Sequence, residues 1–203
     1  KFSVVIPVYN VEGYLAETLD SVIRQSIGFE NNIQIILVND GSPDDSEKIC
    51  LEYAKKYPDN ILYLKQENKG VSAARNYGMQ YVEGKYVNFL DSDDKWTSGS
   101  FQAVYDFFEK RRDKIDLVAC PQKFFEARDD YHWLFFKYEQ GSRIIDVLEK
   151  YNYVQMHVTA SFVKAEVLKT HRFDEKLKFA EDSKFVNSII LDKLKYGVVA
   201  DAL

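Results

Sequence analysis

The sequence predicts an α/β protein with a mostly parallel β-sheet flanked by helices, and three observations support this prediction. Short apolar runs typical of strands buried on both faces occur at residues 2–6, 33–38, 61–64 and 86–90. Segments with apolar residues at helical spacing lie between these runs, and each is long enough for a crossover connection. Polar turn residues follow the runs. Strands and helices that alternate in this way form right-handed βαβ units, which place the strands parallel.

The first two expected helices have capping residues in the sequence. Pro7 ends the first strand, and Asn10 is expected to cap the helix that follows. Ser42 is expected to cap the second helix, with Pro43 at the first helical position, where a missing N–H has no cost. This second helix should end before Pro58. The apolar stripe by which the first helix can pack on the sheet comprises Leu15, Leu19, Val22 and Ile23.

The remaining elements are predicted from the same periodicities. A helix at residues 72–81 carries small side chains that allow close approach to another element, namely Ala73, Ala74 and Gly78. Further helices are expected at residues 101–111, 144–151 and 165–170 and from Glu181 onward, and further strands at residues 116–120, 158–162 and 196–200. Aromatic residues crowd into residues 124–138, which form either core or an oligomer contact, or a flap over a cleft or toward a membrane.

The composition is that of a single globular domain. Its 203 residues, of which 46% are hydrophobic, suffice for one substantial core. A net charge of −5, with acidic and basic residues interspersed, argues against a nucleic-acid partner. The sequence has no apolar run of about 18 residues and no signal-peptide pattern, so we expect no transmembrane segment. Cys50 and Cys120 lie far apart in apolar segments, as reduced thiols of a cytoplasmic protein do.

The strand at residues 86–90 ends in a group of carboxylates. Asp91 and Asp93 would point the same way along an extended segment and Ser92 the other way, so the two carboxylates could share a divalent cation. In open α/β sheets, ligands bind at the carboxyl ends of the strands. The topology alone therefore places these residues where a binding site is expected, although an acidic turn after a strand is also an ordinary structural feature.

The carboxyl edge of the predicted sheet suits a nucleoside diphosphate. Asp40 follows the second strand and can accept a hydrogen bond from a base or a ribose hydroxyl, whereas Arg75 can pair with phosphate. The acidic pair would repel the phosphates, because two like charges 4 Å apart cost roughly 4 kcal/mol at an effective dielectric constant near 20. We therefore expect Mn²⁺ or Mg²⁺ on Asp93, bridging the carboxylates and the phosphate oxygens.

Two other functions that use an α/β sheet can be compared with the sequence. A dinucleotide-binding enzyme needs a G-x-G-x-x-G turn after its first strand, and here that position holds Pro7, Val8, Tyr9 and Asn10. An aspartate-nucleophile phosphohydrolase also has an apolar strand that ends in D-x-D, which residues 89–93 match locally. That motif normally follows the first strand, and here it follows the fourth. The phosphohydrolase, with Asp91 as nucleophile, stays open as an alternative.

Four segments together resemble the successive signatures of the family 2 glycosyltransferases, which have the GT-A fold. They are residues 4–10 (VVIPVYN), 37–44 (LVNDGSPD), 68–76 (NKGVSAARN) and 89–94 (FLDSDD). Glu181 and Asp182 resemble the later E-D pair of this family. Residues 100–175 carry no matching signature, as expected for the part that selects the acceptor. The resemblance implies a Rossmann-like nucleotide-binding half at residues 1–98 and a smaller acceptor-binding half at residues 99–203.

The resemblance further implies an inverting transfer of a sugar from a nucleotide sugar, commonly a UDP-sugar, to an acceptor hydroxyl. In this scheme Asp182 is the general base and Glu181 is its partner or the alternative base. The metal ion is held by Asp93 with Asp91. A metal that stabilises the departing diphosphate makes a general acid unnecessary, whereas a glycosidase would need two carboxylates. The implied nucleotide-binding residues are Pro7, Tyr9, Asn10, Asp40, Asn68, Arg75, Asp91 and Ser92.

The chain departs from the family pattern in one respect. Many relatives supply a further metal ligand from a histidine downstream of the E-D pair, but His132, His157 and His171 all lie upstream. Relatives often also continue beyond the point where this chain stops, which suggests truncation. We expect a cytoplasmic enzyme of cell-surface polysaccharide synthesis, with a glycan or lipid-linked acceptor and a peripheral contact to the inner face of the membrane. The alternative is a non-catalytic nucleotide-sugar-binding module of a larger polymerase.

Overall fold

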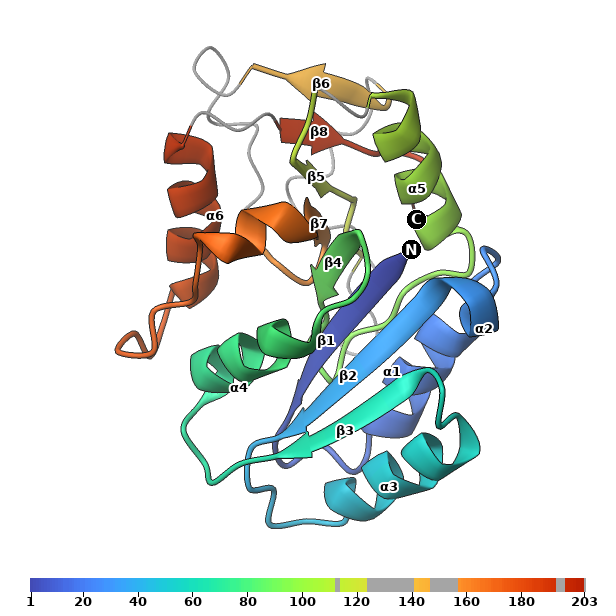
Figure 1. The fold of residues 1–203 in the computed structure, drawn as a ribbon, viewed down its shortest axis with the longest axis vertical. Coiled ribbons are helices and arrows are strands. Elements are labelled where there is room, and N and C mark those ends of the chain that lie inside the picture. The colour runs from blue at the N-terminus through green and yellow to red at the C-terminus, as the bar shows by residue number, and fades with distance from the viewer. Residues whose placement is uncertain (112–113, 124–140, 147–156, 193–195, 203) are drawn as a thin grey trace.

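The computed structural model describes residues 1–203 except 112–113, 124–140, 147–156, 193–195 and 203. Its strands form one eight-stranded sheet in the order β3-β2-β1-β4-β7-β5-β8-β6 (Figure 1). The strands are β1 (Phe2–Val8), β2 (Ile33–Asn39), β3 (Ile61–Lys65), β4 (Tyr86–Phe89), β5 (Leu117–Ala119), β6 (Arg143–Ile145), β7 (Ser161–Lys164) and β8 (Tyr196–Val198). The pairs from β3 to β4 are parallel, whereas β7 is antiparallel to β4 and β5. The predicted mostly parallel α/β fold is confirmed.

Helices cover both faces of this sheet (Figure 1). They are α1 (Leu15–Ile23), α2 (Phe29–Asn32), α3 (Ser46–Lys56), α4 (Val71–Gly78), η1 (Met79–Tyr81), α5 (Ser100–Lys110), η4 (Ala165–Lys169) and α6 (Glu181–Leu191). One core contains Val4 and Ile6 with residues of α1, α3 and α5. The other contains Val5 with residues of α4, η4 and α6. Because successive side chains of a strand point to opposite faces, β1 contributes to both cores and the molecule has three layers.

The helix α4 lies unusually close to the sheet, as its small residues predict. A Cβ atom added at Gly78 would lie 2.6 Å from Val5 Cγ1 and 3.1 Å from Val38 Cγ2. Real Cβ atoms do not approach other atoms as closely as the first of these distances, so only glycine fits here without a shift. This contact fixes the depth of α4 over β1 and β2, and with it the position of Arg75 on the same helix.

Two of the expected helix starts are wrong. Helix α1 begins at Leu15 rather than directly after Asn10, and α3 begins at Ser46 rather than at Pro43. Asn10 has a φ of 56°, and its backbone N–H donates a hydrogen bond to Ser42 Oγ over 2.7 Å. The Ser42 hydroxyl therefore joins two loops instead of capping a helix, which is a known competing use of such side chains.

In the second half, the sequence predictions hold less well. Ile144, expected in a helix, lies in β6, where it is opposite Gly197 of β8, so strand pairing overrides the local periodicity. The rest of that predicted helix falls mostly outside the described residues, as does the aromatic segment at residues 124–138. The strand expected at residues 158–162 begins only at Ser161, because the chain before it is bonded to Asn88 and Asp182 instead. The short helix α2 was not predicted.

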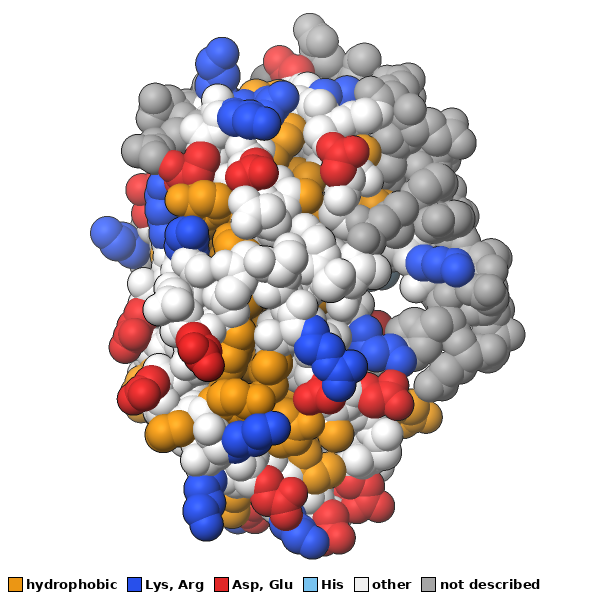
Figure 2. Space-filling model, turned by 90° about the vertical axis from the view of Figure 1, so that its right-hand side faces the viewer, with side chains coloured by type: hydrophobic (Ala, Val, Ile, Leu, Met, Phe, Trp, Pro, Cys, Tyr) orange, Lys and Arg blue, Asp and Glu red, His pale blue; other side chains and the backbone are white. Residues whose placement is uncertain are grey.

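Charge distribution, helix length and cysteine burial can be compared with what the composition predicts. Figure 2 shows acidic and basic side chains interspersed over one face, with hydrophobic side chains gathered among them in its lower half. None of the described helices is long and apolar enough to span a membrane. Cys50 and Cys120 are both buried thiols, as expected of core cysteines.

Candidate active site

A cleft of about 410 Å³ opens where the parallel strands β1 to β4 end. Its lining comes from the segments that follow β1, β2, β3 and β4, which meet at one edge of the sheet, and from Glu181 at the start of α6. The residues predicted from the sequence that line it are Pro7, Tyr9, Asp40, Asn68, Arg75, Asp91, Ser92, Asp93 and Glu181. Gly70 and Val71, at the start of α4, also line it. Asn10 and Asp182 were predicted for the site but are not among the lining residues.

The carboxylate of Asp40 organises the loop between β3 and α4. Its Oδ1 accepts hydrogen bonds from Gln66 Nε2 (2.7 Å) and from the Lys69 backbone N–H (2.8 Å). Its Oδ2 accepts one from the Gly70 N–H (2.8 Å), and α4 begins at the next residue. A carboxylate has about four acceptor positions, so Asp40 can hold this loop and still accept one hydrogen bond from a ligand.

The chain beside Tyr9 is held by a network around Asp44. Asp44 Oδ2 accepts a hydrogen bond from the Glu12 N–H (2.9 Å), and Oδ1 accepts one from the Ser46 N–H (3.2 Å). Burial raises the pKa of Asp44, but hydrogen bonds from Ser42, Ser46 and Glu12 outweigh it and lower the pKa to about 2. The network fixes the backbone, while the Tyr9 side chain remains 49% exposed at the cleft.

The acidic segment after β4 is a turn rather than an extended segment. The Asp94 N–H donates to the Asp91 carbonyl oxygen over 3.1 Å, so the expected strand-like alternation of side chains is wrong here. Asp91 and Asp93 nevertheless both line the cleft. They differ in their partners, because Asp91 accepts hydrogen bonds from Arg75 Nη2 (2.7 Å) and Thr159 Oγ1 (2.9 Å), whereas the Asp93 side chain is exposed.

The Arg75 guanidinium joins carboxylates from two distant parts of the chain. Its Nη2 lies 2.7 Å from Asp91 Oδ1, and its Nη1 lies 2.6 Å from Asp182 Oδ1 and 3.2 Å from Glu181 Oε1. The Phe173 ring packs against it, with the ring centroid 5.0 Å from Cζ. Arg75 is only 1% exposed and its Nε has no hydrogen-bond partner among the described residues. The guanidinium predicted to bind phosphate is therefore engaged by protein carboxylates in this structure.

This ion cluster shifts the pKa values of two of its members. Burial tends to lower the pKa of Arg75, but the carboxylates of Asp91, Asp182 and Glu181 outweigh it and raise that pKa, so Arg75 stays charged. Burial raises the pKa of Asp182, and the Asp91 charge adds to this effect, while Arg75 opposes it. A raised pKa makes Asp182 a better proton acceptor than an ordinary surface carboxylate.

Two further residues complete the site and were not predicted from the sequence. Thr159 donates to Asp91, and Asn88 holds the segment around Thr159 in place. Asn88 is buried in β4, and its Nδ2 donates to the carbonyl oxygens of Thr159 and Ser161 (2.8 Å each), while its Oδ1 accepts from Trp96 Nε1 (3.1 Å). A buried asparagine in an otherwise apolar strand is the signal that could have found this contact, because buried polar groups need partners. Thr159 itself carries no such signal.

The residues of the cleft fit a divalent cation that is shared with a ligand. In the described parts of the chain, no group of three His, Cys, Asp or Glu side chains is arranged to hold a metal ion. His171 is a core residue, since Nδ1 lies 3.0 Å from the Val167 carbonyl oxygen and Nε2 lies 3.2 Å from that of Ser188. Mg²⁺ is commonly held by one or two carboxylates together with substrate phosphates, and the exposed Asp93 carboxylate at the cleft suits this arrangement.

Asp94, in the turn beside the cleft, has a raised pKa. Burial raises its pKa, the carboxylates of Asp91 and Asp93 raise it further, and a hydrogen bond with Thr159 opposes them, so that the pKa is about 7. The same three-carboxylate turn therefore contains one group, Asp94, that is about half protonated at pH 7 and one, Asp93, that faces the cleft. This limits the negative charge that a diphosphate would meet.

The sheet and this cleft are those of a glycosyltransferase domain with the GT-A fold, and comparisons with known proteins agree. The family model described as Glycosyl transferase family 2 matches residues 3–172. The chain therefore belongs to this family, which removes the phosphohydrolase alternative.

Two relatives from Bacillus subtilis are similar over almost the whole chain. The minor teichoic acid biosynthesis protein GgaB is 52% identical over 201 residues, which cover 99% of this chain and 22% of GgaB. The minor teichoic acid biosynthesis protein GgaA is 40% identical over 203 residues, which cover 98% of this chain and 45% of GgaA. The chain thus spans less than half the length of either relative.

A solved structure is also similar in fold. S. aureus TarS 1–349 in complex with UDP matches 99% of this chain and 58% of that chain, with a TM-score of 0.85 and 25% sequence identity. The same TarS fragment in complex with UDP-GlcNAc gives a TM-score of 0.86.

Proposed function

We propose that this chain transfers a sugar, with inversion, from a nucleotide-diphosphate sugar to an acceptor hydroxyl. One observation carries the proposal: Arg75 joins the E-D pair of α6 to Asp91 at the edge of the cleft. Asp91 of the donor cleft and the candidate base Asp182 thereby belong to one ion cluster. The TarS complexes with UDP and UDP-GlcNAc favour a UDP-sugar as the donor.

The cleft supplies suitable groups for each part of such a donor. The exposed ring of Tyr9 can stack on the base, with Pro7 beside it, and the open acceptor position of Asp40 can receive a base or ribose donor. Asn68 and Ser92 are further polar groups of the lining. Asn10 is proposed to act only indirectly, through the loop that presents Tyr9. Arg75 would reach phosphate by giving up part of its contact with Asp91.

Asp182 is proposed as the general base, and Glu181 as its partner. Both carboxylates contact Arg75 Nη1, and among the described residues Asp182 Oδ2 accepts only the Val158 N–H, over 3.3 Å. Asp182 therefore keeps lone pairs that can accept the proton of an acceptor hydroxyl as that oxygen attacks the sugar. The base, the hydroxyl and the sugar carbon must lie in line for an inverting displacement, and Arg75 holds the base in one orientation.

Asp93, with Asp91, would hold Mn²⁺ or Mg²⁺ together with the diphosphate. A bound cation supplies charge stabilisation to a departing diphosphate, so that no general acid is needed there. Asp91 is already bonded to Arg75 and Thr159, which leaves Asp93 as the main protein ligand.

The names of the two Bacillus subtilis relatives favour a role in teichoic acid or related cell-surface polysaccharide synthesis. The acceptor would then be a glycan or a lipid-linked chain, and the enzyme would act in the cytoplasm at the inner face of the membrane. Because the chain spans only part of these relatives, a nucleotide-sugar-binding module of a larger polymerase is the competing proposal.

Calorimetric titration with UDP, GDP, UDP-GlcNAc and UDP-glucose, each with and without Mn²⁺, tests the donor proposal. We expect a UDP compound to bind more tightly than GDP, with Mn²⁺ increasing the affinity. Asp93→Asn should remove the Mn²⁺ effect while leaving metal-free UDP binding in place. Equal affinity for all four compounds, or no binding in a version of the chain lengthened to match GgaA, would contradict the proposal. Binding without any turnover of donor in that longer version would favour the non-catalytic module.

A further inference from the structure

The loop that leads into α6 exposes apolar side chains beside the candidate base. It comprises residues 174–180 and projects from the body of the molecule beyond the amino-terminal end of α4 (Figure 1). Phe179 is 85% exposed and Leu177 is 37% exposed. A fully exposed phenylalanine leaves its ring hydrated, which costs free energy unless another molecule covers it. The proposed donor site and general base do not use these two side chains.

This loop is exposed although both of its ends are anchored to neighbouring helices. At its start, Asn76 of α4 bonds twice to the backbone of Phe173, through Nδ2 to the carbonyl oxygen and through Oδ1 to the N–H (2.9 Å each). At its end, Lys184 of α6 forms an ion pair with Asp174 (2.5 Å). The Phe173 ring stacks on Phe185 of α6, with centroids 4.1 Å apart. Both ends are therefore fixed, and the tip is held away from the core.

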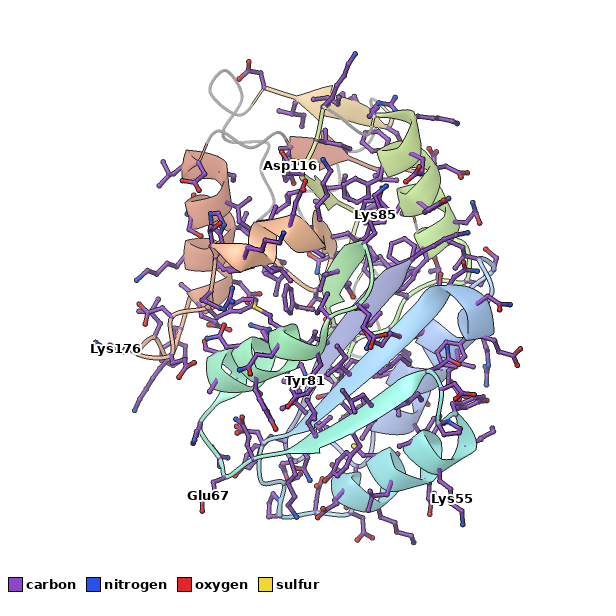
Figure 3. The ribbon with its side chains drawn as sticks, in the orientation of Figure 1. Lys55, Glu67, Tyr81, Lys85, Asp116 and Lys176 are labelled. Atoms are coloured by element: carbon purple, nitrogen blue, oxygen red, sulfur yellow. The ribbon has the colours of Figure 1, made fainter. Side chains whose placement is uncertain are left out.

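The charge at the tip is positive. Among the described residues, neither Lys176 nor Lys178 forms an ion pair, and the nearby Asp174 is paired with Lys184. Glu175 keeps its negative charge, and its Oε1 is held toward α4 by a hydrogen bond from the neutral amide of Asn76, through Nδ2 (2.9 Å). Figure 3 shows Lys176 at the outer edge of the molecule. The tip thus alternates cationic and apolar side chains, Lys176, Leu177, Lys178 and Phe179.

The position of the tip relative to the base fits one repeat of a polymer. Phe179 precedes Asp182 by three residues, and a chain of three residues spans at most about 11 Å. Ala180, between them, has a φ of 59° and turns the chain into α6. A polymer whose terminal hydroxyl touches Asp182 therefore has its next unit within reach of Phe179.

We propose that residues 176–179 form an acceptor subsite for an anionic chain of sugar or polyol units joined by phosphodiesters. The Phe179 ring would cover the apolar C–H face of the unit next to the reacting one, and Lys176 and Lys178 would pair with the flanking phosphodiester groups. This inference rests on the proposed function, since it places the acceptor of that reaction. A lipid bilayer fits less well, because the tip lies within three residues of Asp182, and only a polymer acceptor has to bring a hydroxyl to that carboxylate.

Direct binding of defined probes tests this subsite. The anionic probe is a fluorescent oligomer of glucose units joined by phosphodiesters, and the neutral probe is a dextran of the same length. We expect the wild-type chain to bind the anionic oligomer more tightly than dextran, with an affinity that falls as salt rises. Phe179→Ala should weaken binding of the anionic oligomer about tenfold. The double variant Lys176→Ala/Lys178→Ala should weaken it by a similar factor and remove most of the salt dependence.

Matched controls separate this effect from a general loss of apolar surface or charge. Leu191→Ala removes another exposed apolar side chain of α6, which is 79% exposed, and Lys48→Ala/Lys55→Ala removes two lysines of α3, where Lys55 lies at the opposite edge of the molecule (Figure 3). Both controls should bind the anionic oligomer as the wild type does. UDP affinity should be unchanged in all variants. If the wild type did not bind UDP, the proposed donor site would be wrong, independently of the acceptor subsite.

Two outcomes would overturn the proposal. One is equal affinity of the wild type and the Phe179 and lysine variants for the oligomer. The other is that the Phe179 and lysine substitutions abolish binding to phosphatidylglycerol vesicles but leave binding of the oligomer intact. That result would identify this tip as a membrane contact.

Discussion

Arg75 Nη1 lies 2.6 Å from Asp182 Oδ1, and this contact connects α4 to the first turn of α6 across 107 positions of the sequence. The same guanidinium contacts Asp91 through its other terminal nitrogen. One buried cation therefore sets the distance between the donor side of the cleft and the candidate base. Binding of a donor at Asp91 would therefore alter the contacts of Asp182 through the rigid Arg75 guanidinium.

Replacing Arg75 by methionine should destabilise the fold strongly. The substitution leaves Asp91, Glu181 and Asp182 close together without a counter-charge, and removing one partner of a buried ion pair costs about 3–5 kcal/mol. Urea unfolding at neutral pH measures the loss. The control is Arg24→Met, because Arg24 is 75% exposed and its ion pair with Asp20 should contribute less than about 1 kcal/mol. Equal losses for the two variants would show that the Arg75 cluster has no special role in stability.

The rate of transfer should fall at acidic pH because of Asp182. Burial raises the pKa of Asp182 above its ordinary value of 3.8, and only the deprotonated carboxylate can accept a proton. The rate at saturating donor should therefore rise with pH through a pKa above 3.8 and then level off. A pH profile of kcat measures this. A midpoint at or below 3.8, with the fold intact, would argue against Asp182 as the base.

Gly78→Ala should destabilise the protein although alanine favours helices. The added Cβ would meet Val5 Cγ1 at 2.6 Å, so α4 must move away from β1 and β2. Overpacking of this kind costs about 1–3 kcal/mol, of which the helix propensity of alanine returns about 1 kcal/mol. Thermal unfolding would detect the net loss, and Gly13→Ala is the control because nothing lies within 4 Å of its added Cβ. A Gly78→Ala protein as stable as the control would contradict the close packing of α4.

Asp44→Ala should lower the free energy of unfolding by about 1 kcal/mol at neutral pH, through the loss of hydrogen bonds to a charged acceptor. The folded-state pKa of Asp44 is about 2, below its ordinary value of 3.8. The charged carboxylate therefore stabilises the fold above pH 3.8, and this contribution is lost as the pH falls toward about 2.

The difference between wild type and Asp44→Ala should accordingly shrink across that acidic window. Chemical unfolding at several pH values measures it, with Asp59→Ala as a control at an exposed acidic residue. If the difference between wild type and Asp44→Ala stayed constant down to pH 2, the low pKa of Asp44 would be wrong.

The parts of the fold that the sequence predicts best are those set by local pattern. The strands β1, β2 and β4 are largely apolar runs because both of their faces are buried, whereas β3, at the edge of the sheet, is mostly half-buried. The close approach of α4 to the sheet was also predictable, because a small residue such as Gly78 inside a helix indicates close packing.

The parts that the sequence predicts poorly depend on partners far along the chain. Ser42 has the side chain of a helix cap, but its hydroxyl accepts the N–H of Asn10, 32 positions away. Ile144 has a helical neighbourhood, but it pairs with β8. In the site, the position of Arg75 at the cleft was predictable from its place after the third strand. Its contacts with Glu181 and Asp182 were not, because they need the packing of α6 against α4.

Transfer by Asp182→Asn is the most direct test of the central claim. Asparagine keeps the size and the polarity of the side chain but cannot accept the proton. We expect UDP to bind with nearly wild-type affinity and transfer to fall by at least about 100-fold, the lower range for a lost general base. Glu181→Gln, measured alongside, should retain more activity. Unchanged turnover in Asp182→Asn, with UDP bound normally, would contradict the account.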